Sequence, residues 1–197
     1  MTPLVGVLAL QGDFTEHVTA LQRAGVRTRE VRLERDLEGL DGFVLPGGES
    51  TTMLRLLDAE KLEEPVGRVL RSGIPVLATC AGLILVARSV TNPDQRSYGL
   101  LDVAVARNGY GRQYHSGTFD LEGDALPPGT RGVFIRAPRV LECGPEVEVL
   151  ARRGDDPVLM SSGPVLAACF HPELELDHPV TAMFVARVRE GRQAVAR

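Results

Sequence analysis

Short apolar runs alternate along the first half of the chain with segments whose apolar residues recur every three or four positions. A short apolar run bounded by turn residues is typical of a buried strand, whereas the three-to-four spacing indicates an amphipathic helix. Strands that alternate with helices predict parallel strands with helices on both faces. The expected strands are residues 4–10, 26–33, 42–45 and 74–79, and the expected helices are 13–24, 50–57, 63–72 and 81–89.

Signals at the helix ends support this reading. Asp13 and Glu16 have the spacing of a capping box, and Gly25 follows the last apolar position as a stop. The pattern therefore predicts that Asp13 caps the first helix.

The second half has a different pattern, with short β-like runs separated by turns rich in Gly and Pro. We interpret these runs as antiparallel strands added to a doubly wound sheet. No internal repeat or linker divides the chain, so we expect one domain over residues 1–197. The expected strands are 101–107, 133–135, 147–151, 158–160 and 165–170, followed by a helix at 180–190.

Composition narrows the classes of function. The 197 residues are 44% hydrophobic and 24% charged, with a net charge of -4 and no block of Lys or Arg that would indicate nucleic-acid binding. No run is long enough to span a bilayer, and the apolar N-terminal stretch lacks the flanks of a signal peptide. Three widely spaced cysteines argue against a disulfide framework or a zinc site and fit the cytoplasm. We expect no metal and no cofactor.

Cys80 stands where an apolar strand meets a helix, among small residues. This is the context of a nucleophile elbow, a sharp turn that exposes its central side chain. The helix N-terminus favours the thiolate, and the N–H of Ala81 would face an oxyanion forming on an attacked carbonyl. Gly82 fits the elbow pattern, and Ala78 stands where a second Gly is usual. Cysteines in isolation are mostly inert buried thiols, so the assignment needs a partner.

His171 supplies that partner at the end of an apolar strand, in the order His171-Pro172-Glu173. Pro172 favours an extended conformation at His171, and residues two apart in an extended chain face the same side. Glu173 can then hold the imidazole with one nitrogen free to accept a proton, as in a nucleophile-base-acid triad. The other histidines, His17, His115 and His178, show no recognisable chemistry.

Two polar clusters remain open to more than one reading. The stretch 45–52 ends a strand with Gly47 and Gly48, whose N–H groups could supply a second oxyanion donor. It lacks the lysine of a phosphate loop, and a plain turn with a Ser50 N-cap is the alternative. Arg107 and Arg136 could bind a substrate carboxylate or be ordinary surface residues.

With these residues in hand, the chain resembles the class I, triad-type glutamine amidotransferases, and among them the glutaminase subunits of pyridoxal 5'-phosphate synthase. The resemblance spans essentially the whole chain. The elbow and the His-Pro-Glu segment mark the class, and the Gly-Gly-Glu-Ser-Thr and Phe-Ile-Arg-Ala-Pro segments mark the subunit. The segments that carry it are Val7-Leu8-Ala9-Leu10-Gln11-Gly12, residues 45–52, Thr79-Cys80-Ala81-Gly82-Leu83-Ile84, Arg107-Asn108-Gly109-Tyr110-Gly111-Arg112-Gln113, Phe134-Ile135-Arg136-Ala137-Pro138 and Phe170-His171-Pro172-Glu173-Leu174.

The resemblance implies a flavodoxin-like three-layer α/β/α fold and a glutaminase. Cys80 would attack the glutamine amide and form a thioester that water hydrolyses, with His171 as base and then acid and Glu173 orienting it. It further implies that docking to a synthase subunit activates the chain and that ammonia passes to that subunit, with no cofactor on this chain. Gly48 and Ala81 would form the oxyanion hole, and glutamine would contact Gly47, Gly48, Glu49, Ser50, Arg107, Ile135 and Arg136.

The sequence departs from the family pattern at Tyr114-His115-Ser116-Gly117, where an acidic residue, Ser and an aromatic are usual, and at Ala78. Two other classes of function stay open. A different cysteine hydrolase, such as a peptidase or a glutamyl hydrolase, would use the same triad without a synthase partner. A non-catalytic module would keep Cys80 only as a redox-sensitive thiol, but such a sensor does not need an oriented base.

Overall fold

A parallel sheet with two antiparallel strands at one edge organises the protein. The structure, a computed structural model, describes residues 2–109 and 116–195. Its main sheet has the order β10-β11-β12-β4-β3-β1-β2, and β2-β1-β3-β4-β12 run parallel, which is the flavodoxin-like order. The parallel strands are β1 (Leu4–Leu8), β2 (Arg27–Val31), β3 (Gly42–Leu45), β4 (Val76–Thr79) and β12 (Val165–Ala168).

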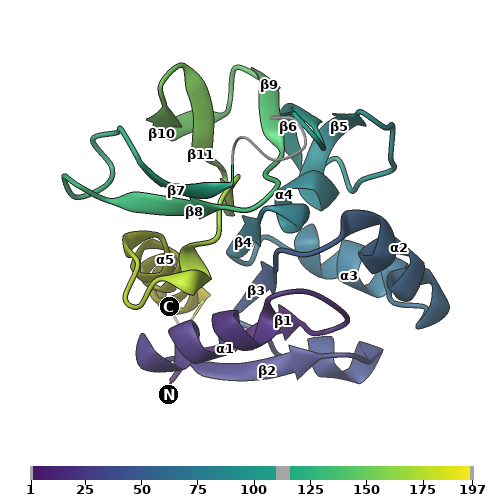
Figure 1. The fold of residues 1–197 in the computed structure, drawn as a ribbon. Coiled ribbons are helices and arrows are strands. Elements are labelled where there is room, and N and C mark those ends of the chain that lie inside the picture. The colour runs from purple at the N-terminus through teal and green to yellow at the C-terminus, as the bar shows by residue number, and fades with distance from the viewer. Residues whose placement is uncertain (1, 110–115, 196–197) are drawn as a thin grey trace.

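Antiparallel strands extend this sheet and stand beyond it. Strands β10 (Glu148–Arg153) and β11 (Asp156–Ser162) form a hairpin that joins the sheet through β12. Two smaller sheets combine β5 (Ala87–Thr91), β6 (Leu101–Ala106) and β9 (Arg139–Cys143), and β7 (Gly117–Asp120) with β8 (Arg131–Phe134). These elements lie together at the top of Figure 1, beyond the carboxyl end of β4. The added antiparallel strands expected in the second half are confirmed except at 165–170, because this run forms β12, which runs parallel to β4 inside the main sheet.

Helices cover the two faces of the parallel strands (Figure 1). On one face α1 (Phe14–Arg23) contacts α5 (Pro179–Val195), and on the other α2 (Ser50–Ala59) contacts both α3 (Glu63–Leu70) and α4 (Ala81–Val86). Two short 3-10 helices, η1 (Glu34–Leu37) and η2 (Pro172–Leu174), complete the described elements. The three-layer arrangement expected from the sequence is confirmed.

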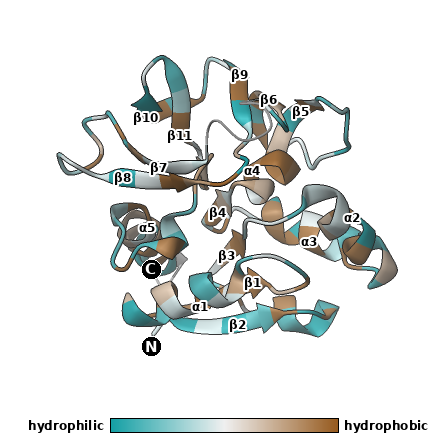
Figure 2. Ribbon diagram, in the orientation of Figure 1, coloured by the Kyte–Doolittle hydropathy of each residue, from teal (hydrophilic) through white to brown (hydrophobic). Residues whose placement is uncertain are grey.

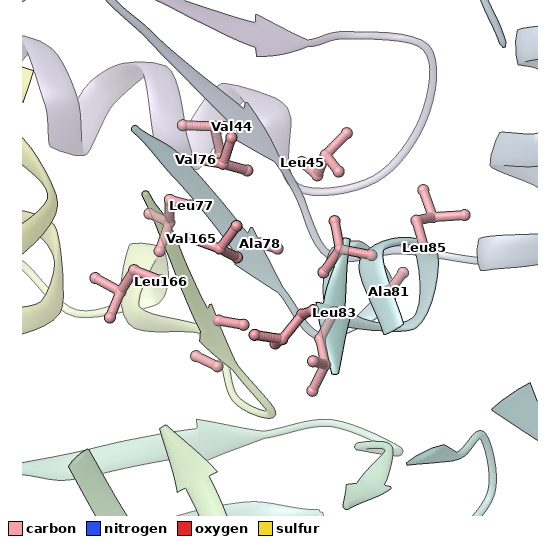
Figure 3. Close-up of a cluster of buried hydrophobic side chains, with 14 of the residues drawn as sticks. Val44, Leu45, Val76, Leu77, Ala78, Ala81, Leu83, Leu85, Val165 and Leu166 are labelled. Carbon is pink, nitrogen blue, oxygen red and sulfur yellow. The ribbon is translucent and has the colours of Figure 1, made fainter. Parts of the chain in front are cut away.

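The core lies where the middle strands meet both helical layers. Figure 2 shows β3 and β4 as largely hydrophobic and the edge strand β2, which is only partly buried, as largely hydrophilic. In Figure 3, Leu77 and Ala78 of β4 lie beside Val165 and Leu166 of β12. Since these middle strands are buried along their whole length, their carboxyl ends are fixed positions for functional side chains.

The helix expected at 81–89 is wrong in its second half. It ends at Val86, and the chain continues directly as β5, which pairs with β6. Arg88 therefore lies in β5, and its guanidinium is 2.6 Å from the carboxylate of Asp102 in β6 and 2.7 Å from that of Glu142 in β9. The strand conformation of residues 87–91 depends on pairing with β6. The apolar residues of the segment did not indicate that pairing. Strands β7 and β9 were also not expected.

Candidate active site

Cys80 occupies a strained turn between β4 and α4. Its backbone φ is +46° with ψ of -101°, a region that non-glycine residues rarely adopt. Its N–H donates to the carbonyl of Ala168 at 2.9 Å, which ties the turn to β12. The side chain is 6% exposed and borders a pocket. The elbow predicted from the sequence is thus present, and it forms with Ala78 in the strand.

Gly82 allows this turn to pack against β3. A Cβ at this position would stand 2.1 Å from the carbonyl oxygen of Leu45, closer than any real contact. The residue after Cys80, Ala81, begins α4, so its N–H is one of the helix donors without a partner inside the helix. Figure 3 shows Ala81 and Leu83 of this helix close to Leu45 at the end of β3.

His171 and Glu173 meet as predicted, both buried. The Nδ1 of His171 lies 2.8 Å from Oε1 of Glu173, which sits in η2. A carboxylate only accepts hydrogen bonds, so Nδ1 carries a proton and donates it to Glu173, which leaves Nε2 as the nitrogen that can exchange a proton with other groups. Within the described part of the chain, Nε2 has no hydrogen-bond partner. A buried nitrogen kept free in this way is what a general base requires.

Asp13 stands at the N-cap position of α1, but its side chain belongs to this cluster. It makes no side-chain cap hydrogen bond, so the predicted capping box is wrong. Its Oδ2 lies 3.2 Å from His171 Nδ1 instead. The chain enters α1 with the N–H of Asp13 donating to the carbonyl of Gly47 at 3.2 Å, which turns the side chain towards the imidazole.

His17 lies one helical turn after Asp13 and is buried beneath the same cluster. Its Nε2 is 3.0 Å from the hydroxyl of Thr79 and 3.3 Å from Oε2 of Glu173. Thr79 immediately precedes Cys80, so His17 connects the end of β4 to Glu173, the partner of His171. This role of His17 was not expected from the sequence. The spacing of four between Asp13 and His17 places both on one helix face and was the available signal.

The charges of the cluster follow from these contacts. Burial alone would lower the pKa of His171, but its interactions with Asp13, Cys80 and Glu173 outweigh it and raise the pKa to about 12. The hydrogen bond with His171 in turn lowers the pKa of Asp13. Burial lowers the pKa of His17, and Glu173 opposes this only in part, so His17 is neutral at pH 7. The cluster thus holds an imidazolium between carboxylates.

A pocket opens over the Cys80 side chain. Of the residues expected to bind substrate, it gathers all except Gly47, and it adds Ile84 and Asn108, which were not expected. Gly47 stands behind the pocket, where a Cβ would be 2.3 Å from Cε1 of His171. The pocket is lined by Gly48, Glu49, Ser50, Cys80, Ile84, Arg107, Asn108, Ile135 and Arg136.

Opposite charges face each other in this pocket. Arg136 has a left-handed φ of +44° and its guanidinium is 2.8 Å from the carboxylate of Glu49. The carbonyl of Ile135 lies 4.0 Å from the Cys80 sulfur. An ammonium group and a carboxylate on one small molecule could each replace one partner of the Glu49–Arg136 pair. The pocket therefore suits a zwitterion such as an amino acid.

The glycine turn is held by hydrogen bonds that the sequence did not reveal. The N–H of Glu49 donates to Oε1 of Gln11 at 2.8 Å, and a Cβ on Gly48 would collide with that same Gln11 side chain. Ser50 is the first residue of α2 and not its N-cap, and its hydroxyl donates to Gln95. Tyr110, Gly111, Arg112, Gln113 and His115 lie outside the described residues.

One cluster has the composition of a metal site. Asp13, His171 and Glu173 each offer a ligand atom within 4.8 Å of the others. The Nδ1 of His171 already donates its proton to these carboxylates at hydrogen-bond distances, and a metal would have to displace that proton. The donor set therefore fits a hydrogen-bonded triad better than a metal centre. The three cysteines, Cys80, Cys143 and Cys169, are all free thiols.

Comparison with known proteins decides the family. The model of the SNO glutamine amidotransferase family matches residues 7–190, nearly the whole chain. The chain belongs to this family. The expected resemblance to glutamine amidotransferases is thereby confirmed. The matched region begins in β1 and ends in α5.

Two relatives that cover nearly the whole chain carry the same name. The SNO family member is 51% identical over 190 residues to "Pyridoxal 5'-phosphate synthase subunit PdxT" of Parafrankia sp., covering 95% of this chain and 94% of the relative. It is 46% identical over 186 residues to the protein of that name from Thermotoga neapolitana, covering 94% and 99%. A solved structure described as a glutamine amidotransferase is 46% identical and superposes with a TM-score of 0.86 over 94% of this chain and 98% of that one.

The helices that the structure describes were also searched for membrane spans. None of them combines the length and the apolar character needed to cross a bilayer.

Proposed function

We propose that this chain is the glutaminase subunit of a pyridoxal 5'-phosphate synthase, acting as one domain through Cys80, His171 and Glu173. The observation that carries the proposal is the strained Cys80 at the edge of a pocket that holds the Glu49–Arg136 pair, beside a buried His171–Glu173 pair. Membership of a glutamine amidotransferase family, with relatives named as subunits of this synthase, supports the substrate and the partner.

In this mechanism Cys80 reacts as the thiolate and His171 is the imidazolium beside it. The sulfur attacks the amide carbon of glutamine, and a C–S bond forms as the carbonyl becomes an oxyanion. The N–H groups of Ala81 and Gly48 would stabilise that oxyanion. His171 then gives its proton from Nε2 to the leaving nitrogen, the C–N bond breaks, and ammonia departs from a thioester.

The second half of the reaction restores the site. After ammonia leaves, His171 is neutral, and Nε2 can accept a proton from water as the water attacks the thioester carbon. The C–S bond breaks and glutamate is released with the thiolate and imidazolium regenerated. Glu173 keeps the Nδ1 proton in place throughout, so that Nε2 always faces the reacting atoms.

The pocket residues take complementary roles in glutamine binding. We assign the substrate α-carboxylate to Arg136 or Arg107 and the α-ammonium group to Glu49. Gly48, Ser50 and Ile135 would contact the rest of the molecule, and Gly47 would support His171 from behind. Glutamine has to open the Glu49–Arg136 pair in order to bind.

Ammonia would pass to the synthase subunit, and no cofactor is assigned to this chain. The three free thiols suit a cytoplasmic protein. The test is glutamate release from glutamine by the purified chain, with and without the synthase subunit. A large increase on adding the subunit supports the proposal. No release in either condition, with the fold intact and the thiols reduced, contradicts it in favour of another hydrolase or a binding module.

A further inference from the structure

His171 has two carboxylate partners on the same nitrogen. Its Nδ1 is 2.8 Å from Oε1 of Glu173 and 3.2 Å from Oδ2 of Asp13. The two acids come from different parts of the fold, Glu173 from η2 after β12 and Asp13 from the start of α1. A triad needs only one acid to hold the imidazole, so the contact of Asp13 with the same nitrogen calls for a separate explanation.

We propose that Asp13 is a positioning residue that shares with Glu173 the orientation of His171 and the stabilisation of its imidazolium form. This inference rests on the proposed function of the triad, because it assigns Asp13 a part in the same proton transfers. Asp13 touches neither the pocket nor Cys80 and therefore acts only through His171.

Asp13 and Glu173 differ in solvent exposure, and the difference lets each of them support His171 in its own way. The Glu173 side chain has no exposed area, whereas that of Asp13 is 37% exposed. Asp13 also stands at the N-terminus of α1, where the helix dipole stabilises a negative charge. Asp13 can thus remain ionised at little desolvation cost, while the buried Glu173 depends on His171 for compensation.

Within residues 2–109 and 116–195, the ionisable groups that face His171 come from three elements. Asp13 and His17 come from α1, Glu173 from η2 and Cys80 from the elbow. His17 is neutral, so the imidazolium is balanced by the two carboxylates and the thiolate. When one carboxylate is removed, the other still holds the Nδ1 proton, and loss of both leaves the ring free to turn.

The shared support of His171 can be tested by measuring kcat/KM for glutamine in the complex with the synthase subunit. The variants are Asp13→Asn, Glu173→Gln and the two combined. We expect the double variant to lose about tenfold more activity than the product of the two single losses, a typical coupling within one network. Glu16→Gln is the matched control, because Glu16 is an exposed acid on the same helix. A double variant equal to the product, or to Glu173→Gln alone, overturns the inference.

A second measurement does not depend on glutaminase activity. The rate of alkylation of Cys80 by iodoacetamide, followed by mass spectrometry, changes when the neighbouring imidazolium loses its proton. Removing the Asp13 charge destabilises the imidazolium, so the change in alkylation rate should occur at lower pH in Asp13→Asn than in the wild type. In Glu16→Gln it should occur at the same pH as in the wild type. Asn is a good N-cap residue, so the fold should persist, as thermal unfolding would verify.

The two measurements separate the two claims. A wild-type complex without glutaminase activity contradicts the proposed function, and the alkylation profile still decides the role of Asp13. An active wild type whose alkylation step is unchanged by Asp13→Asn overturns this inference alone.

Discussion

The Cα of Gly82 faces the carbonyl oxygen of Leu45 so closely that a Cβ there would stand 2.1 Å from that oxygen. This contact lets α4 begin directly after Cys80 and lie against the end of β3. It makes the nucleophile turn dependent on one glycine inside a helix, a position where glycine is otherwise unfavourable.

Gly82→Ala should therefore destabilise the protein despite the better helix propensity of Ala. We expect a loss of about 1–3 kcal/mol in the free energy of unfolding, typical of overpacking a core, and a large loss of glutamate release as Cys80 shifts. Gly191→Ala in α5 is the control, since its Cβ would meet Pro75 only at 3.7 Å. That variant should gain up to about 1 kcal/mol. Equal urea unfolding curves for both would contradict this account of the turn.

His171→Asn should reduce kcat for glutamine by several orders of magnitude, because the imidazolium, the proton donor and the later base all disappear together. Glu173→Ala should cost less, because it removes only part of the support of the ring, and Asp13 remains at 3.2 Å. The measurement is steady-state glutamate release in the complex with the synthase subunit. A larger loss in Glu173→Ala than in His171→Asn would refute the assignment of His171 as acid and base.

Arg136→Met should raise KM for glutamine by about tenfold or more, the loss expected when one charge-assisted contact to the substrate carboxylate is removed. Its stability should barely change, since the pair with Glu49 is exposed at 69% and 49%. Arg68→Met is the matched control, as Arg68 forms exposed ion pairs with Glu34 and Glu64 and lies outside the pocket. If KM rises equally in both variants, Arg136 has no specific role in binding.

Acid should destabilise the fold through His178. Its Nε2 contacts the carbonyl of Arg131 at 2.9 Å and its Nδ1 accepts from the N–H of Val180, so the ring is held neutral. Burial lowers its pKa in the folded state. A lowered pKa contributes stability that is present above the unfolded value of about 6.5 and is lost as pH falls below it, by up to about 1.4 kcal/mol per pH unit.

Urea unfolding of the wild type and His178→Gln at several pH values checks this. The wild type should lose more stability than the variant between about pH 6.5 and pH 5, in the window set by the unfolded histidine. His17, whose pKa is also lowered, contributes with the same sign in both proteins. His171 does not contribute in this window, because its raised pKa keeps it protonated in the folded state and the unfolded residue is protonated below its own pKa. Parallel pH profiles would contradict the role of His178.

The sequence was sufficient for the parts of the site that depend on local order along the chain. Cys80 is recognisable because an apolar strand, small residues and a helix follow one another, and Glu173 because two residues in an extended chain face the same side. Burial of β4 and β12 places both motifs at neighbouring strand ends. The structure brings together what these local patterns indicate separately.

The parts that the sequence did not reveal depend on contacts between distant segments. Asp13 has the spacing of a helix cap, and only the approach of α1 to η2 directs it to His171. The end of α4 at Val86 follows from the pairing of β5 with β6, which outweighs the local apolar pattern. Gln11 gives no local sign that it holds the Glu49 backbone, because that contact joins two loops.

The most direct test of the central claim is to find which side chain glutamine acylates. A glutamine analogue that carries a reactive ketone in place of the amide should alkylate one cysteine in the complex with the synthase subunit, as read by peptide mass spectrometry. Burial raises the pKa of the Cys143 and Cys169 thiols, so neither should react at neutral pH. The account predicts one adduct, on Cys80, that excess glutamine prevents. An adduct on Cys143 or Cys169, or none on Cys80, would contradict it.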